Sequence, residues 1–402
     1  MDASPDHSVA ILSAVRTPIG KHGGALRATP ATALGVLVAR AAIARARLAP
    51  PQIDDVLFGQ TIQAGAGQNP ARQVLRGAEI PDPVGAATIN MVCGSGLKAL
   101  LLGNTALRAG DSNVALVGGM ESMSCAPYLV PSEVRWGTRF GNRTLEDAML
   151  KDSLLDAYGE HEHMGLTGDR IAEKFHFSRT DVDTFALRSH RLASAARVDG
   201  TWANEIVPVP PDLTPRGAGL EQDEGPRADT SLEALARLKP VFRPDGVQTA
   251  GNSSQLSDGA AALVLASAAF VDRHGLAPLA WIHSGCVSGV NPRDVMESPI
   301  PTVRKHLERT GFAPADFDRV EHNEAFASAS IAVQRTFGFT DRQFNVHGGA
   351  VALGHPIGAS GARIVVSLVH ELVRSNSRLG LATLCMGGGN GLSVIVDRRP
   401  MK

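Results

Sequence analysis

The sequence has few aromatic residues, few cysteines and no long apolar run. Aromatic residues make up 4% of its 402 residues, so the core must be built from Ala, Val, Leu and Ile. The longest apolar run, around residues 260–271, is too short to cross a bilayer. Residues 1–20 lack the basic start and apolar stretch of a secretory signal. We therefore expect a cytoplasmic protein without membrane contact.

The four cysteines are widely spaced, and none belongs to a C-x-x-C pair: Cys93, Cys125, Cys286 and Cys385. This spacing argues against zinc and thioredoxin-like sites, and we expect no metal. So few cysteines in so long a chain suit a reducing compartment. The formal net charge is −1 and the basic residues are scattered, so no nucleic-acid partner is indicated.

Alternating strand-like and helix-like segments in the first 120 residues favour an α/β layered fold. Short apolar runs predict buried strands at residues 9–15, 56–60, 87–92 and 113–117. Stretches rich in Ala and Leu predict helices at residues 31–48 and 96–107. Residues 125–250 are richer in charge and proline, which we interpret as an excursion from the core, with helices expected at 167–175 and 179–198. The α/β alternation then resumes.

Two distant segments of the chain look alike. Cys93-Gly-Ser-Gly-Leu-Lys98 and Gly358-Ala-Ser-Gly-Ala-Arg363 each open a predicted helix. Each helix is followed by an apolar strand that ends in paired glycines. The echo indicates a duplicated α/β half, although Gly-Ser-Gly before a helix is also a common pattern without any duplication.

Cys93 lies between a predicted strand and a predicted helix. A helix N-terminus presents unpaired N–H groups and the positive end of the helix dipole. Both stabilise a thiolate, so we expect a nucleophilic cysteine whose pKa is lowered. The alternative interpretation is a small buried residue without a chemical role.

Three further motifs contain groups that a nucleophilic thiol needs. His355, in a Gly-His-Pro turn, is a candidate base. The glycines after Cys385 let backbone N–H groups approach a substrate oxygen. Asn323-Glu-Ala-Phe326 places an amide and a carboxylate before an Ala-rich helix. Each motif also has an interpretation without a catalytic role. His355 could be a histidine in a surface turn, and the glycines after Cys385 could form a tight β-hairpin turn. Asn323 could be a helix N-cap, with Glu324 as an acid in the first turn.

In this order, the motifs C-G-S-G, N-E-A-F, G-H-P and C-x-G resemble the four active-site motifs of the thiolases, and the resemblance runs from Val9 to Val396. It implies a five-layer αβαβα fold with two duplicated halves. The N-terminal half would comprise residues 1–124 and 251–276, and the C-terminal half residues 277–402. A loop domain at residues 125–250 would cover coenzyme A.

The resemblance implies a CoA-dependent acyltransferase that reversibly cleaves 3-ketoacyl-CoA, or condenses acetyl-CoA, through an acyl-enzyme on Cys93. His355 would take the thiol proton, and Cys385 would act as acid and base at the α-carbon. His355 and a water on Asn323 would form one oxyanion hole, and the N–H groups of Cys93 and Gly387 the other. CoA and acyl-CoA are implied as substrates, with no permanently bound cofactor. Expected contacts with them are His163, Met164, Arg227, Ala250, Ser254 and Phe326.

Residues 296–301 depart from the family's Gly-rich M-G-x-G-P pattern, because Glu297 is present and one glycine is replaced. The acyl chain and the favoured direction therefore stay open. Residues 132–145 resemble an arm that would bridge dimers in a homo-oligomer, either a dimer or a dimer of dimers (a homotetramer). One alternative function is an acyl-CoA-binding protein without turnover. The other is a decarboxylating ketoacyl synthase, which typically uses two histidines and lacks a cysteine like Cys385.

Overall fold

The computed structural model describes residues 7–400, and a mixed ten-stranded sheet forms its centre. The strands are β1 (Val9–Arg16), β2 (Gly20–Lys21), β3 (Asp55–Gly59), β4 (Gly85–Ile89), β5 (Val114–Ser122), β8 (Ser257–Ser267), β9 (Ala280–Gly289), β10 (Arg319–His322), β11 (Leu379–Met386) and β12 (Asn390–Asp397). Their order is β10-β11-β12-β9-β1-β8-β5-β3-β4, with β2 paired to β8.

Two groups of four strands share one topology. In the first, β3 is parallel to β5, β5 is antiparallel to β8, and β8 is antiparallel to β1. In the second, β10 is parallel to β11, β11 is antiparallel to β12, and β12 is antiparallel to β9. Helix α3 (Ser95–Ala109) leads into β5, and α11 (Ile357–Arg374) leads into β11. The duplication expected from the sequence is therefore confirmed.

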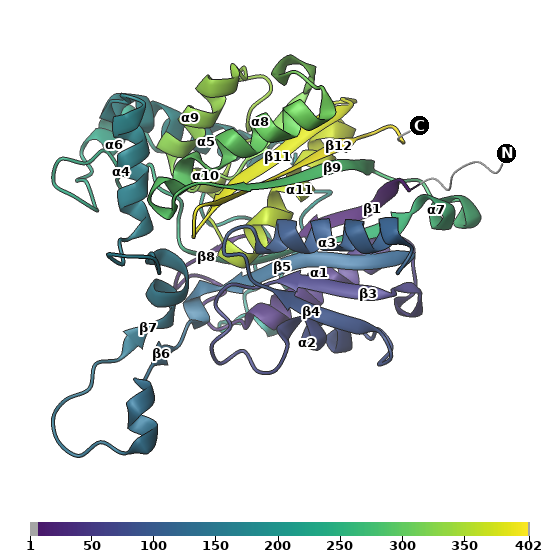
Figure 1. Ribbon diagram of the computed structural model, residues 1–402, viewed down its shortest axis with the longest axis horizontal. Coiled ribbons are helices and arrows are strands. Elements are labelled where there is room, and N and C mark those ends of the chain that lie inside the picture. The colour runs from purple at the N-terminus through teal and green to yellow at the C-terminus, as the bar shows by residue number, and fades with distance from the viewer. Residues whose placement is uncertain (1–6, 401–402) are drawn as a thin grey trace.

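The helices complete five layers (Figure 1). Helices α3 and α11 lie between the two strand groups within one apolar core. Helices α1 (Ala31–Arg45) and α2 (Pro70–Gly77) cover the outer face of the first group. Helices α8 (Pro299–Thr310) and α9 (Ala327–Phe337) cover the outer face of the second. The αβαβα arrangement expected from the resemblance is confirmed.

The two similar segments, Gly-Ser-Gly at residues 94–96 and Ser-Gly at residues 360–361, lie where α3 crosses α11. A Cβ atom on Gly361 would lie 2.5 Å from the backbone nitrogen of Leu97, and one on Gly96 would lie 2.9 Å from that of Ala362. Both distances are too short for any side chain. Glycine therefore lets the first turns of the two helices touch, which brings the segments of Cys93 and His355 together.

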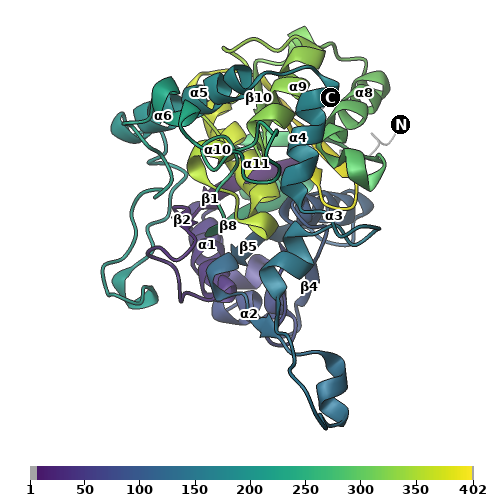
Figure 2. The ribbon, with the colours of Figure 1, turned by 90° about the vertical axis from the view of Figure 1, so that its left-hand side faces the viewer.

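The chain between β5 and β8 forms a separate group of elements (Figure 2). It holds α4 (Met164–Lys174), α5 (Arg179–Val198) and α6 (Leu232–Ala236), and a two-stranded sheet of β6 (Tyr128–Leu129) and β7 (Glu146–Asp147). Ser178 caps α5 through the backbone N–H of Asp181, as the sequence predicts. An arm projects from the end of the β6–β7 pair and carries the 3-10 helix Ser132–Trp136.

One strand differs from its prediction. The run at residues 87–92 was expected to form a buried strand, but β4 ends at Ile89 and is only partly buried. It lies at the edge of the sheet and pairs on one side, with β3. The following residues turn sharply toward α3 instead of extending the strand.

Among the described residues no helix is long and apolar enough to cross a membrane. The expectation about residues 1–20 partly concerns residues 1–6, which lie outside the described range.

Candidate active site

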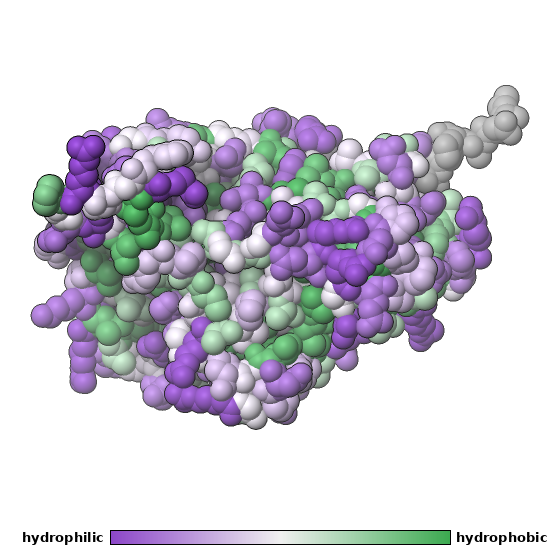
Figure 3. Space-filling view, turned by 90° about the horizontal axis from the view of Figure 1, so that it is seen from below, coloured by the Kyte–Doolittle hydropathy of each residue, from purple (hydrophilic) through white to green (hydrophobic). Residues whose placement is uncertain are grey.

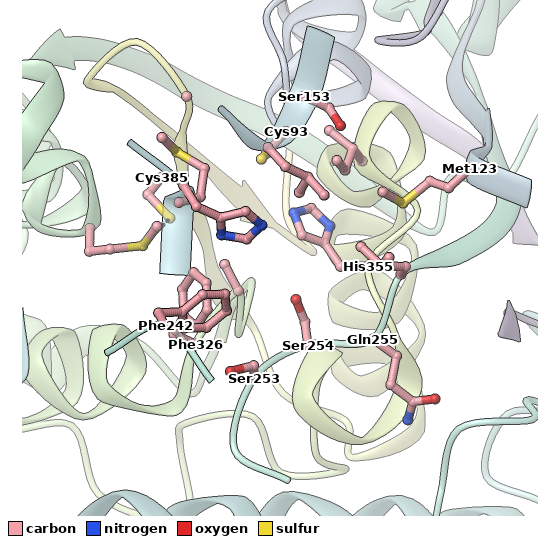
Figure 4. Close-up of a pocket in the computed structure, with 18 of the residues that line it drawn as sticks. Cys93, Met123, Ser153, Phe242, Ser253, Ser254, Gln255, Phe326, His355 and Cys385 are labelled. Atoms are coloured by element: carbon pink, nitrogen blue, oxygen red, sulfur yellow. Dashed lines mark hydrogen bonds between the residues drawn. The ribbon is translucent and has the colours of Figure 1, made fainter. Parts of the chain in front are cut away.

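A largely apolar cavity of about 400 Å³ lies where the starts of α3 and α11 meet the loop before β8 and the start of α4 (Figure 4). Its walls come from both duplicated halves and from the segment between β5 and β8. Nine of the residues selected from the sequence line it: Cys93, His163, Met164, Ala250, Ser254, Phe326, His355, Cys385 and Gly387.

Cys93 reaches the cavity through a strained turn. Val92 has a φ of 49°, which is rare for a β-branched residue and turns the chain sharply before α3. The backbone N–H groups of Gly387 and of Cys93 itself donate toward the sulfur. An oxygen bound to carbon at this sulfur would therefore lie close to two N–H donors.

The surroundings of Cys93 favour the neutral thiol over the thiolate. Its side chain lines the cavity and is only partly exposed. Burial raises the pKa of Cys93 to about 11, the N–H groups of Gly387 and Cys93 oppose the rise, and Glu121 adds to it. The predicted lowering of this pKa is wrong, because desolvation of the thiolate outweighs the field of the helix N-terminus. The thiol therefore needs a base.

His355 lines the same cavity as Cys93. Its backbone N–H donates to the carbonyl of Gln255 (3.0 Å), and its side chain is buried rather than on the surface, so the surface-turn alternative is wrong. Nδ1 lies 2.5 Å from the Ser360 hydroxyl oxygen, and that hydroxyl donates to the carbonyl of Pro356 (2.9 Å). Because the hydroxyl proton is used in this way, Nδ1 carries the ring proton and Nε2 has the free lone pair.

Burial lowers the pKa of His355 to about 3, and the positive charge of Arg363 lowers it further. The imidazole is therefore neutral at physiological pH. Asn323 lies beside it, with its Nδ2 3.3 Å from His355 Nε2. In the close-up, the ring of His355 lies between the side chains of Cys93 and Ser254 (Figure 4).

Asn323 is buried and is not a helix cap, because α9 begins at Ala327 with Phe326 as its N-cap. Glu324 is not a first-turn acid either. Its buried carboxylate accepts hydrogen bonds from Ser189, Asn345 and the backbone N–H of Val351. The N-cap alternative is therefore wrong, and Glu324 braces the loop that holds Asn323.

Cys385 is the penultimate residue of strand β11, and the turn from β11 to β12 is a tight β-hairpin. The hairpin-turn interpretation is thus correct, and the same turn brings the N–H of Gly387 to Cys93. The sulfur of Cys385 lies 3.7 Å from that of Met296. Burial raises the pKa of Cys385 strongly, and the neighbouring Cys93 adds to the rise.

Of the expected CoA-binding residues, all except Arg227 line the cavity. The side chain of His163 caps α4 by accepting from the N–H of Gly165, and its ring stacks on Phe242 at 4.8 Å. Phe242 in turn packs edge-on against Phe326. Arg227 is exposed and does not line the cavity; its backbone N–H donates to His190.

The sequence interpretation missed three features of the site. Ser360, the partner of His355, was recognisable only as a small residue in the first turn of α11. Phe242 comes from a proline-rich loop without a regular pattern. The segment Met149–Leu154 lines the cavity but has no motif. Glu297 points away from the cavity and pairs with Lys174 (2.6 Å), whereas its neighbours Val295 and Met296 form part of the wall.

Among the described residues, the remaining thiols and acids form no metal cluster. All four cysteines are free. Cys125 is exposed and Cys286 is buried away from the cavity. Within residues 7–400 no group of three or more His, Cys, Asp or Glu side chains is arranged to hold a metal ion.

Comparison with known proteins agrees with this geometry. The family described as thiolase, N-terminal domain, matches residues 9–269, and that described as thiolase, C-terminal domain, matches residues 276–398. An acetyl-CoA acetyltransferase of Pseudomonas aeruginosa is 46% identical over 97% of this chain and 99% of its own length. One from Escherichia coli K12 is 44% identical over 96% of this chain and 98% of its own.

Solved structures give the same result. The Bacillus anthracis acetyl-CoA acetyltransferase superposes with a TM-score of 0.94 at 39% identity, covering 99% of this chain and 100% of that one. Human mitochondrial 3-ketoacyl-CoA thiolase in complex with CoA gives 0.93 at 38% identity, with 98% of each chain covered.

The fold and the paired thiols define an acyltransferase that works through thioesters. The chain belongs to the thiolase family. It is a CoA-dependent thiolase, and neither a binding protein without turnover nor a decarboxylating synthase is favoured.

Proposed function

We propose that this thiolase acts on short acyl chains as an acetyl-CoA acetyltransferase, interconverting two acetyl-CoA with acetoacetyl-CoA and CoA. The observation that supports this most is the joining of two thiols, Cys93 and Cys385, and one neutral imidazole, His355, at a single apolar cavity. Two sulfurs allow two tasks to be separated, covalent capture of an acyl group and proton transfer at carbon.

In the first half-reaction, His355 Nε2 takes the proton of Cys93 as its sulfur attacks the thioester carbonyl of acetyl-CoA. The N–H groups of Cys93 and Gly387 donate to the oxyanion of the tetrahedral intermediate. Cys385 gives its proton to the departing CoA sulfur. Cys93 then carries the acetyl group, and Cys385 is left as a thiolate.

In the second half-reaction, the Cys385 thiolate takes a proton from the methyl group of a second acetyl-CoA. Burial favours this step, because a thiol with a raised pKa has a strongly basic thiolate. The enolate oxygen is stabilised by His355 and by a water on Asn323. The enolate carbon attacks the acetyl group, acetoacetyl-CoA forms, and the Cys93 thiolate recovers its proton from His355.

The preference for short chains rests on the walls of the cavity and on the relatives. Met296 contacts the Cys385 sulfur, and Met164 and Phe326 belong to the same apolar cluster and also line the cavity. Relatives 42–46% identical are named acetyl-CoA acetyltransferases. The human structure is instead named a 3-ketoacyl-CoA thiolase, so acyl preference must be measured.

The test is a series of thiolysis rates from acetoacetyl-CoA to long and branched 3-ketoacyl-CoA substrates. We expect the largest kcat/KM for acetoacetyl-CoA and complete loss of activity in Cys93→Ala. A larger kcat/KM for long chains would reject the acetyl-specific assignment, and no thiolysis of any substrate would reject the activity itself.

We also propose that residues 125–250 act as the domain that covers CoA, between halves formed by residues 1–124 with 251–276 and by residues 277–402. His163, Met164, Ala250 and Ser254 would contact the pantetheine arm, Phe326 the acyl group, and the exposed Arg227 a phosphate outside the cavity. A reducing compartment such as the cytoplasm would keep both catalytic thiols active.

The projecting arm supports self-association into a dimer of dimers. Its large apolar side chains are exposed, among them Trp136 (85%) and Phe140 (93%). Figure 3, seen from below, shows apolar residues gathered on the left of this face, on the side from which the arm projects. Exposed patches of this kind mark protein contacts. We expect Trp136→Ser with Phe140→Ser to halve the mass measured by light scattering. An unchanged mass would contradict this role.

A further inference from the structure

The side chain of Asn323 lies between His355 and a buried guanidinium. Its Nδ2 faces His355 Nε2 (3.3 Å), and its Oδ1 lies 3.5 Å from the Nη2 of Arg363. Arg363 stands in the second turn of α11 and is 2% exposed. Its other terminal nitrogen, Nη1, lies 3.7 Å from the carboxylate of Glu321 on β10, which is 3% exposed.

These contacts determine which end of the Asn323 amide faces the catalytic imidazole. A guanidinium only donates hydrogen bonds, so the amide atom beside Arg363 must be the oxygen. The NH2 group is then directed to His355. Rotation of the amide by 180° about its last torsion costs little by itself. Without Arg363 the amide oxygen is therefore free to turn toward the site, where it could no longer donate to the water that is proposed to stabilise the enolate.

Arg363 also places a positive charge behind the side-chain amide of Asn323. Arg363 is held between Asn323 and Glu321, with its positive charge on the side of the amide away from His355. A fixed positive charge there favours negative charge that develops on a substrate oxygen beside Asn323 and His355. Burial lowers the pKa of Arg363, and the nearby Glu321 opposes that lowering. Burial raises the pKa of Glu321, and Arg363 opposes that rise.

We propose that Arg363, beside Glu321, is a positioning residue for the carbon–carbon bond-forming half of the reaction, because it directs the amide NH2 of Asn323 toward His355 and the water that donates to the enolate oxygen. The proposal rests on the function proposed above. It separates the two half-reactions, since capture of the acyl group at Cys93 uses the N–H groups of Cys93 and Gly387 and forms no enolate.

The test compares two activities of each variant. One is exchange of the acetyl group between acetyl-CoA and isotopically labelled CoA, which needs only the acyl-enzyme. The other is thiolysis of acetoacetyl-CoA, which also needs the enolate. We expect Arg363→Met to lower kcat of thiolysis about 10- to 100-fold relative to exchange, with KM changed less than threefold. Arg363→Lys, which also only donates, should recover most of the loss.

Two further variants keep the result interpretable. The double variant Arg363→Met with Glu321→Gln removes the guanidinium together with the buried acid beside it, so it should fold even if the single variant does not, and it should show the same selective loss. Arg319→Met breaks another ion pair between β10 and α11, Arg319 with Glu371 (2.7 Å), and should change neither activity selectively.

Two results would overturn the proposal. One is a parallel fall of exchange and thiolysis in the folded double variant, which would mean a purely structural role. The other is an unchanged ratio of the two activities in every Arg363 variant. Absence of both activities in the unaltered protein would instead reject the function proposed above, so the two failures are distinguishable.

Discussion

The ionisation of Cys93 provides a sharp test of how this site works. The sequence suggests a thiolate stabilised by a helix N-terminus, whereas the structure places the thiol where burial raises its pKa to about 11. A rise of about two units from the ordinary value near 9 corresponds to roughly 2.7 kcal/mol against the thiolate. The ionised fraction is then ~1 in 10⁴ at pH 7 and ~1 in 100 at pH 9.

The measurement is the far-ultraviolet absorbance of thiolate as a function of pH, recorded for the unaltered protein and for Cys93→Ser. The difference between the two isolates Cys93, because the other three cysteines are common to both. We expect no step in the difference between about pH 5 and pH 9, and a rise only above that. A step centred between pH 5 and pH 8 would show a thiolate–imidazolium pair and refute the account of His355 as the base for a neutral thiol.

Three substitutions test other parts of the site. Ser360→Ala removes the acceptor for His355 Nδ1 and should lower kcat about tenfold with KM little changed; an unaltered kcat would contradict the tautomer assigned to His355. Gly119→Ala would place a Cβ 2.1 Å from the carbonyl oxygen of Gly358 and should lower Tm by several degrees, whereas Gly85→Ala, with open space around it, should not. Met296→Ala should raise kcat/KM for longer 3-ketoacyl-CoA relative to acetoacetyl-CoA; a fall would place the acyl chain elsewhere.

Much of the fold was predictable because it follows from local patterns. Apolar runs mark β1, β5 and β8, the cap at Ser178 marks the start of α5, and the similar segments around Gly96 and Gly361 mark two equivalent helix starts. The contact of Gly96 and Gly361 with the opposite helix gives that last pattern its physical reason. The edge position of β4 was not predictable, since a strand's partners are not encoded in its own residues.

The candidate site was likewise predictable only in part. Cys93, His355 and Cys385 stand in short motifs, so their chemistry was accessible from the sequence. Their protonation states were not, because burial depends on every element packed around the cavity and outweighs the local helix field. The support that Ser360 and Arg363 give is likewise visible only once α11 is placed against β10 and the loop of Asn323.

The central claim is that Cys93 carries the acyl group between two CoA thiols. Mass spectrometry of protein incubated briefly with acetyl-CoA and quenched in acid tests it most directly. We expect one acetyl group per chain, located on the peptide that contains Cys93 and absent in Cys93→Ala. An acetyl group on Cys385 instead, or turnover that continues in Cys93→Ala, would contradict the account.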